Sequence, residues 1–232
     1  TAQRASQAGR LLPRRLLGGD CVACGSDRYT ARMALLDRLP PAPDNASFAV
    51  FSVASALAAA LVLAFDFVPI LDHVNLAFHE AGHFFFGLFG ELMHWLGGTL
   101  GQFVFPIACA VHFLRREQVL QAAGCALWAC ENLRYVAFYL GDARTQALPL
   151  VGGGQHDWAY LLGRFGLLEQ DQAIASVLVF LCWAGWLAVW SAVAWWWWQG
   201  RQQRAELADA QRRQQIIEAA RERERARKAQ RG

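Results

Sequence analysis

Two histidines and a glutamate lie within five residues of one another in an apolar part of the chain. His79, Glu80 and His83 belong to the run His-Glu-Ala-Gly-His. On a helix, residues i and i+4 share one face, so both imidazoles can converge on a single ion. Glu80 stands beside the first histidine, where it can orient or deprotonate a water molecule on that ion. The spacing predicts a Zn²⁺ site with His79 and His83 as ligands and Glu80 as general base.

The third protein ligand is expected from a segment more than seventy residues later. A catalytic zinc ion typically takes three protein ligands and keeps one position for water. His156 and Asp157 follow three successive glycines at 152–154. Glycine permits backbone conformations closed to other residues, so this segment can approach another element closely. The residues leave Asp157 and His156 as alternatives for the third ligand.

Two further side chains near the motif bear on the site. Asn75 lies four residues before His79 and would share its helical face, where it could bond a substrate carbonyl or orient a ligand. His94 lies near the face of His83, but at about 1.5 Å per residue it would stand about 16 Å away along the same axis. We therefore expect His94 not to share the ion.

The motif lies in a membrane domain by composition. Hydrophobic residues make up 55% of the 232 residues, an excess over soluble domains. Nearly all large apolar side chains fall within 46–198. We predict an Arg-rich arm over 1–44, a membrane domain over 45–198 and a basic helical tail over 199–232.

The apolar runs predict an all-α, polytopic helix bundle. Full crossings are expected over 46–65, 103–114, 119–140 and 174–198. The motif segment 74–98 is expected to enter and return on one face, with the backbone interrupted at Gly97-Gly98. This gives about four spanning helices and a re-entrant or short motif helix, followed by a charged C-terminal helix.

Charge bias favours the same topology. The arm, the Arg115-Arg116 turn and the tail all carry arginines, and the positive-inside rule puts such segments in the cytoplasm. Four crossings then leave both termini cytoplasmic, and they place the His79 end of the motif and the His156-Asp157 loop together on the outer side. We expect an integral protein of a bacterial inner (plasma) membrane.

Polar groups within the apolar runs need partners. Glu131 and Arg134 are three residues apart and are expected to pair with each other across one helical face, for structural or functional reasons. Outside the membrane domain, Cys21 and Cys24 form a lone Cys-x-x-Cys pair, which favours exposed or locally linked thiols over a zinc ribbon.

The tail indicates what the chain contacts. Residues 201–231 carry ten basic and five acidic residues, which suits an anionic lipid surface. No aromatic residue interleaves the basic positions, so we expect no nucleic acid partner. The partners expected are the lipid bilayer and a membrane-protein substrate or a membrane complex that contacts the last helix and the tail.

The His79-to-His83 run resembles the zincin signature, and its place in a membrane segment with a distant aspartate resembles the site-2 protease family of intramembrane zinc metalloproteases. The resemblance covers about residues 74–160. It implies His79, His83 and Asp157 as zinc ligands, Glu80 as the base that activates water, and cleavage of a peptide bond in or near a membrane helix. The third-ligand region, Gln155-His156-Asp157-Trp158, departs from the family pattern of Asn-x-x-Pro followed by Leu-Asp-Gly.

Two functions follow as hypotheses. The first is a membrane-embedded zinc hydrolase, a peptidase or else a lipid amide or ester hydrolase. The second is a non-catalytic membrane subunit in which zinc clamps the 152–157 loop to the motif helix. In that case Trp183, Trp186 and Trp190, which recur at helical spacing, would face a partner helix or lipid.

Overall fold

The computed structural model describes residues 41–151 and 154–231, all within the compact unit Pro40–Gly232. The described part of the chain is helical and contains no strand. Cys21, Cys24 and most of the Arg-rich arm lie outside the described residues. The elements in chain order are α2 Asn45–Ala64, α3 Leu71–Gly87, α4 Glu91–Arg115, α5 Val119–Gly141, α6 Asp157–Arg164, the short 3-10 helix η2 Leu168–Gln170, and α7 Asp171–Ala229.

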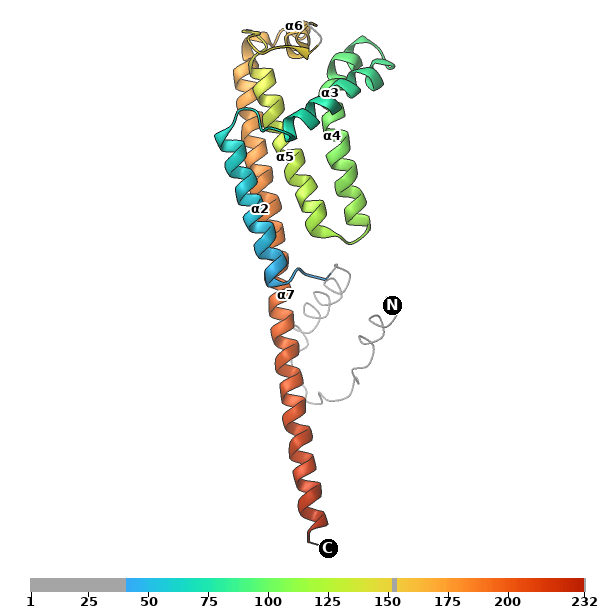
Figure 1. The fold of residues 1–232 in the computed structure, drawn as a ribbon, viewed down its shortest axis with the longest axis vertical. Coiled ribbons are helices and arrows are strands. Elements are labelled where there is room, and N and C mark those ends of the chain that lie inside the picture. Colours follow the sequence, from blue (N-terminus) through green and yellow to red (C-terminus); the bar gives the residue numbers. More distant parts are fainter. Residues whose placement is uncertain (1–40, 152–153, 232) are drawn as a thin grey trace, which may run out of the picture. The chain divides into compact units, whose positions relative to one another are not determined.

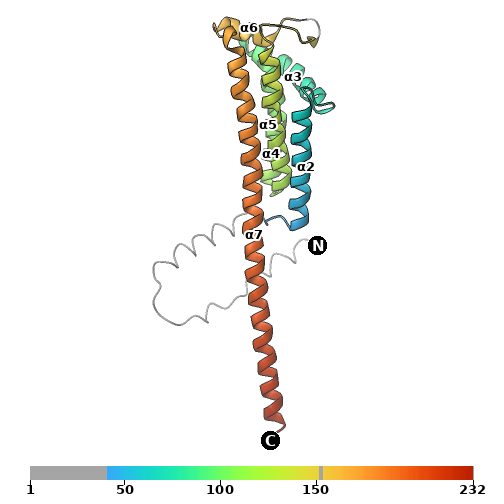
Figure 2. The same ribbon diagram turned by 90° about the vertical axis from the view of Figure 1, so that its left-hand side faces the viewer.

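The long helices alternate in direction. In Figures 1 and 2, α4 and α5 form a hairpin beside α7, and α3 and α6 lie toward the end where α5 finishes and α7 begins. The start of α2 lies against the middle of α7, where the Trp197 indole donates to the Asn45 side chain at 3.1 Å. Both the start of α2 and the long tail of α7 are therefore remote from the end that carries α3 and α6.

Three helical segments are long and apolar enough to cross a membrane. They are Asn45–Ala64, Glu91–Arg115 and Leu168–Ala229. The segment expected as a further crossing, α5, is not among them, because Glu131, Asn132 and Arg134 make it less apolar. The chain thus has the features of an all-helical membrane protein with three candidate spans among the described residues, whereas the sequence predicted four.

The expected break at Gly97-Gly98 is wrong. The chain instead turns at Leu88-Phe89-Gly90, where Gly90 has a φ of 110° that other residues rarely adopt. From Glu91 the helix α4 continues to Arg115. The expected short run at 103–114 is therefore only the second half of one 25-residue helix.

Glycines 97 and 101 have a packing role instead. An added Cβ at Gly97 would lie 2.7 Å from the Gly82 carbonyl oxygen, and one at Gly101 would lie 2.7 Å from the Gly82 Cα. Both distances are well below ordinary van der Waals contact, so α3 and α4 meet backbone to backbone. Glycine at i and i+4 on one helix face leaves room for this close packing. The seam holds the motif helix against α4.

A buried polar network joins α3 to α5. The Asn75 amide donates to Asp72 Oδ1 at 3.0 Å and to Glu131 Oε2 at 2.9 Å, while its oxygen accepts from the Trp128 indole at 2.8 Å. Asp72 in turn accepts from the Val68 backbone amide at 2.5 Å. The Asn75 side chain is bonded to Asp72, Glu131 and Trp128, so it holds α3 against α5. The expectation that it bonds substrate or orients a ligand is wrong.

Glu131 and Arg134 do not pair with each other. Glu131 points to Asn75, while the Arg134 guanidinium donates to the Asp66 carbonyl at 3.2 Å and lies 3.4 Å from Asp66 Oδ1. The expected pair is wrong because each group finds a partner on a different neighbouring segment. Arg134 thereby ties α5 to the segment that follows α2.

A small apolar core sits where α5, α6 and α7 meet. Its buried members are Ala137, Leu140, Ala143, Leu162 and Ala175. The packing of Leu162 into this core fixes the short α6 on the ends of α5 and α7. The residue that begins α6 is therefore held in place by apolar burial.

Candidate metal centre

Three side chains from two distant parts of the chain converge between α3 and α6. His79 Nε2 lies 2.8 Å from Asp157 Oδ2, and His83 Nε2 lies 3.2 Å from the same oxygen. The candidate ligand atoms of all three residues lie within 4.8 Å of one another. Tetrahedral ligands with bonds of about 2.0–2.1 Å stand about 3.3 Å apart. This buried group could therefore hold a metal ion.

The ring of His83 is oriented by the backbone of α4. His83 Nδ1 lies 2.7 Å from the His94 carbonyl oxygen, which can only accept, so Nδ1 carries the hydrogen. In a neutral imidazole the other nitrogen, Nε2, then presents a lone pair to the Asp157 carboxylate. Two acceptors face each other unless a proton or a cation lies between them. A ligand imidazole in a metal site has the same arrangement, with its second nitrogen bonded to a carbonyl.

His94 is closer to His83 than the sequence predicted. Because the chain turns at Gly90, α4 runs back beside α3, and the rings of His83 and His94 are 5.1 Å apart between centroids. His94 Nδ1 donates to the His83 carbonyl at 3.1 Å. The estimate of about 16 Å assumed one continuous helix and is wrong. His94 is not part of the three-residue group, and it supports His83 through paired contacts between side chain and backbone.

Asp157 is the first residue of α6, and its carboxyl group is largely buried. Burial raises its pKa, but hydrogen bonds and charge from His79 and His83 outweigh this effect and bring the pKa to about 2. The backbone amide of Asp157 donates to the Tyr139 hydroxyl at 3.2 Å. Asp157 is therefore ionised at neutral pH and fixed at both its backbone and its side chain.

His156, the alternative third ligand, has another role. Its ring is fully buried and stacks on Tyr139 with centroids 4.1 Å apart. Its Nδ1 accepts from the Ala159 amide at 3.3 Å and so caps α6. Burial lowers its pKa, although Asp142 and Asp157 oppose that shift. The structure thus groups Asp157, and not His156, with the motif histidines.

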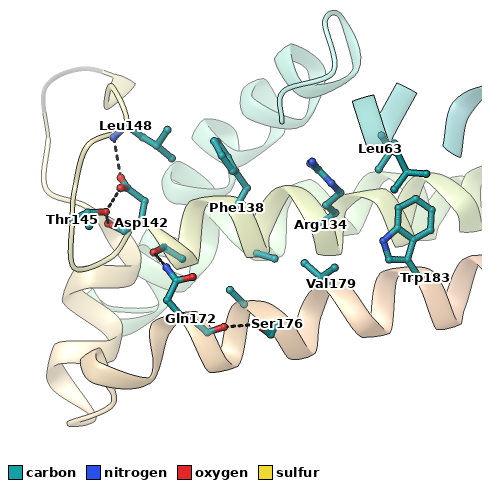
Figure 3. A pocket seen from close by; sticks show the side chains of 14 residues that line it. Leu63, Arg134, Phe138, Asp142, Thr145, Leu148, Gln172, Ser176, Val179 and Trp183 are labelled. Carbon is teal, nitrogen blue, oxygen red and sulfur yellow. Dashed lines mark hydrogen bonds between the residues drawn. The ribbon is translucent and has the colours of Figure 1, made fainter. Parts of the chain in front are cut away.

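The loop before α6 is anchored by Asp142. Its carboxylate accepts from the Thr145 hydroxyl at 2.5 Å and from the Leu148 amide at 2.9 Å (Figure 3). It also accepts from the Ala147 amide at 2.9 Å. Burial raises the pKa of Asp142, but these bonds lower it overall. The ionised Asp142 therefore fixes the path of the chain as it leaves α5 toward Asp157.

Gly98 on α4 packs against the two imidazoles. A Cβ at this position would lie 2.6 Å from His83 Nε2 and 2.5 Å from His79 Cε1. Only glycine leaves this space beside both ring nitrogens free. Glycine at this position thus lets the backbone of α4 pack directly against both imidazoles.

A cavity of about 690 Å³ opens beside the group. The exposed Glu80 lines it together with His79, His83 and Asp157, so the expected base and the three candidate ligands face one space. Its other described side chains are mainly aromatic or aliphatic, among them Phe67, Leu76, Trp95, Tyr135, Phe138, Leu148, Pro149 and Leu150. Glu80 and the three candidate metal ligands therefore lie on one part of the cavity lining, and the rest of the described lining is mainly apolar.

A second cavity, of about 680 Å³, lies between α5 and α7 (Figure 3). Phe138 and Leu148 line both cavities, so the two spaces adjoin. The described lining of this second cavity includes none of His79, Glu80, His83 or Asp157. It is therefore a neighbour of the candidate site and not the site itself.

Two residues that matter at the site escaped sequence reasoning. Tyr139 was visible as a tyrosine in the apolar run 119–140, one turn after Tyr135, but nothing in the sequence tied it to Asp157. Gly98 was visible as a glycine and was interpreted as a helix break. The i+4 spacing of Gly97 and Gly101 was the signal that α4 instead packs closely on another helix.

Among the described residues, the chain is all-helical, has three helices long and apolar enough to span a membrane, and has one buried group that could bind a metal ion. No protein-family model, curated protein or solved structure matches the chain. The evidence on function therefore comes from the group of His79, His83 and Asp157 and the cavity beside it.

Proposed function

We propose that the protein is a membrane-embedded, zinc-dependent hydrolase that cleaves peptide bonds. His79, His83 and Asp157 hold the ion, and Glu80 is the general base. The site opens on the outer side of a bacterial inner membrane, with both termini in the cytoplasm, a topology in which α5 crosses in addition to the three candidate spans. These are the roles that the resemblance to the zincin signature implies for the same residues.

One observation carries the proposal. Glu80 lines the same cavity as the three convergent side chains, although Asp157 comes from a segment 74 or more residues away from the motif. A structural metal site is typically closed by protein ligands, whereas a catalytic site keeps an open position. Three candidate ligands beside an open cavity with a free carboxylate favour the catalytic kind.

The chemistry assigns a task to each group. A divalent cation held by the three side chains would supply a Lewis acid and lower the pKa of a water molecule at its open position to about 7. Glu80 then accepts the proton of the attacking water and delivers it to the leaving amine. The apolar wall of the cavity holds the substrate side chains and excludes bulk water from the reacting carbonyl.

Replacement of Glu80 by glutamine tests the proposal. Full-length protein in detergent would be analysed for bound zinc and assayed with internally quenched apolar peptides. We expect Glu80→Gln to keep its zinc and to lose at least about 100-fold in turnover. Glu91→Gln is the matched control, because the Glu91 carboxylate bonds the Tyr160 hydroxyl at 2.8 Å and does not line the cavity. Wild-type protein without zinc, or Glu80→Gln with full turnover, would refute the proposal.

A non-catalytic role is the second candidate. Its support is the end of α7, where the helix continues to Ala229 and almost every residue from 201 onward is exposed. Such a helix suits docking to a larger membrane assembly, with the metal as a clamp between α3 and α6. In that case Glu80→Gln would change neither the zinc content nor the assembly.

A further inference from the structure

Tyr139 touches both halves of the candidate metal site. It lies on α5, and its ring meets the His79 ring edge to face with centroids 5.8 Å apart. The opposite contact is the stack on His156, which precedes Asp157. One side chain thus bridges the motif helix α3 and the start of α6.

The hydroxyl of Tyr139 acts on Asp157 itself. Its oxygen accepts the Asp157 backbone N–H at 3.2 Å. This bond fixes the backbone from which the Asp157 side chain projects toward His79 and His83. Asp157 is therefore oriented, through its backbone, by one group on α5.

The ring of Tyr139 has a separate effect. It stacks on His156 with an interplanar angle of 22°, and His156 caps α6 through its Nδ1. This contact positions the start of the helix, whereas the hydroxyl positions Asp157 through its backbone N–H. Substitution by phenylalanine removes the second effect and keeps the first.

The geometry points to Tyr139 as the positioning residue that aims the Asp157 carboxylate at the metal, an inference that rests on the proposed metal site. Partners of this kind fix the direction of a ligand, and their loss typically weakens metal affinity by about 10–100-fold. Tyr139 acts through Asp157 and needs no contact with the substrate for this role.

The test is the zinc affinity of the full-length protein in detergent, measured by competition with a chromophoric chelator. We expect Tyr139→Phe to bind zinc about 10–100-fold more weakly than wild type while its helicity in EDTA stays unchanged. Cobalt in place of zinc gives a second measurement, because its visible spectrum reports the ligand geometry and should change in the same variant.

Tyr135→Phe is the matched control. Tyr135 lines the same cavity one turn earlier on α5 and packs on Phe67 with centroids 6.2 Å apart. We expect it to keep wild-type zinc affinity. If Tyr139→Phe binds zinc within twofold of wild type, or if Tyr135→Phe loses as much, the positioning role is refuted while the proposed function stands. Wild-type protein that binds no zinc would overturn both.

Discussion

Substitution of Gly98 by alanine probes the candidate site without touching a ligand. The new Cβ would lie 2.6 Å from His83 Nε2, so that nitrogen would have to move by about 0.8 Å to restore ordinary van der Waals contact. Metal–ligand distances are held within about 0.2 Å. The required shift is several times larger than that tolerance, so an ion held at this site would lose at least one histidine ligand.

The surroundings prevent the rings from moving without cost. His79 is buried against Tyr139, and His83 is held by the His94 carbonyl oxygen. We therefore expect Gly98→Ala to weaken zinc binding by at least about 100-fold, which corresponds to about 2.8 kcal/mol. The assay is chelator competition on purified protein, together with the metal content after dialysis.

Two other glycines separate metal loss from packing loss. Gly124 lies within α5 with nothing within 4 Å of an added Cβ, so Gly124→Ala should keep zinc affinity and gain up to about 1 kcal/mol of stability. Gly101→Ala would press on the α3 backbone at Gly82 and should lower stability. Gly98→Ala that binds zinc as tightly as Gly124→Ala would show that the imidazoles do not converge beside α4.

Three further outcomes are expected. EDTA should lower the thermal unfolding temperature of wild type but not of His79→Ala, since zinc at 100 times its Kd adds about 2.7 kcal/mol to the folded state; equal temperatures with and without EDTA in wild type would contradict this. Asn75→Leu should cost about 3 kcal/mol in chemical unfolding because it leaves Asp72 and Glu131 without their amide donor, whereas Asn45→Ala at an exposed bond should cost under about 1 kcal/mol. In EDTA, the lowered pKa of Asp157 should stabilise the folded state by about 2 kcal/mol at pH values above 3.8, the ordinary pKa of the carboxyl group. This stabilisation should be lost as the pH falls through about 2. Asp157→Asn should lack that pH dependence in unfolding scans.

The motif and its partner segment could be predicted because their signals are local. The i,i+4 spacing puts His79 and His83 on one face of any helix, and the glycine-rich approach singled out His156 and Asp157. The choice between the last two could not be made, because it depends on the stack of His156 on Tyr139. His156 and Tyr139 lie on different segments of the chain, so no periodic pattern in the sequence indicates that they are in contact.

The errors share a physical cause. Gly97 and Gly98 were expected to break a helix on intrinsic propensity, but close packing on α3 offsets that cost. The same misplaced turn put His94 far from His83. Arg134 was expected to pair with Glu131 on its own helix, and Asn75 was expected to bond a substrate or a metal ligand, whereas each bonds to another segment of the chain. Tertiary contacts outweighed local preference in each case.

The reciprocal contacts between His83 and His94 have a consequence for how an ion would be received. A free imidazole samples several rotamers, and a ligand that must freeze them gives up part of its binding free energy. Here the His83 ring is already immobilised when α3 and α4 pack together. The entropy cost of ordering this ring therefore falls on folding and not on ion binding. Capture of a cation would then require the loss of its hydration shell and the release of the proton shared between the imidazoles and Asp157, with no further cost for ordering the His83 ring. Rings held in this way disfavour ions with long coordination bonds.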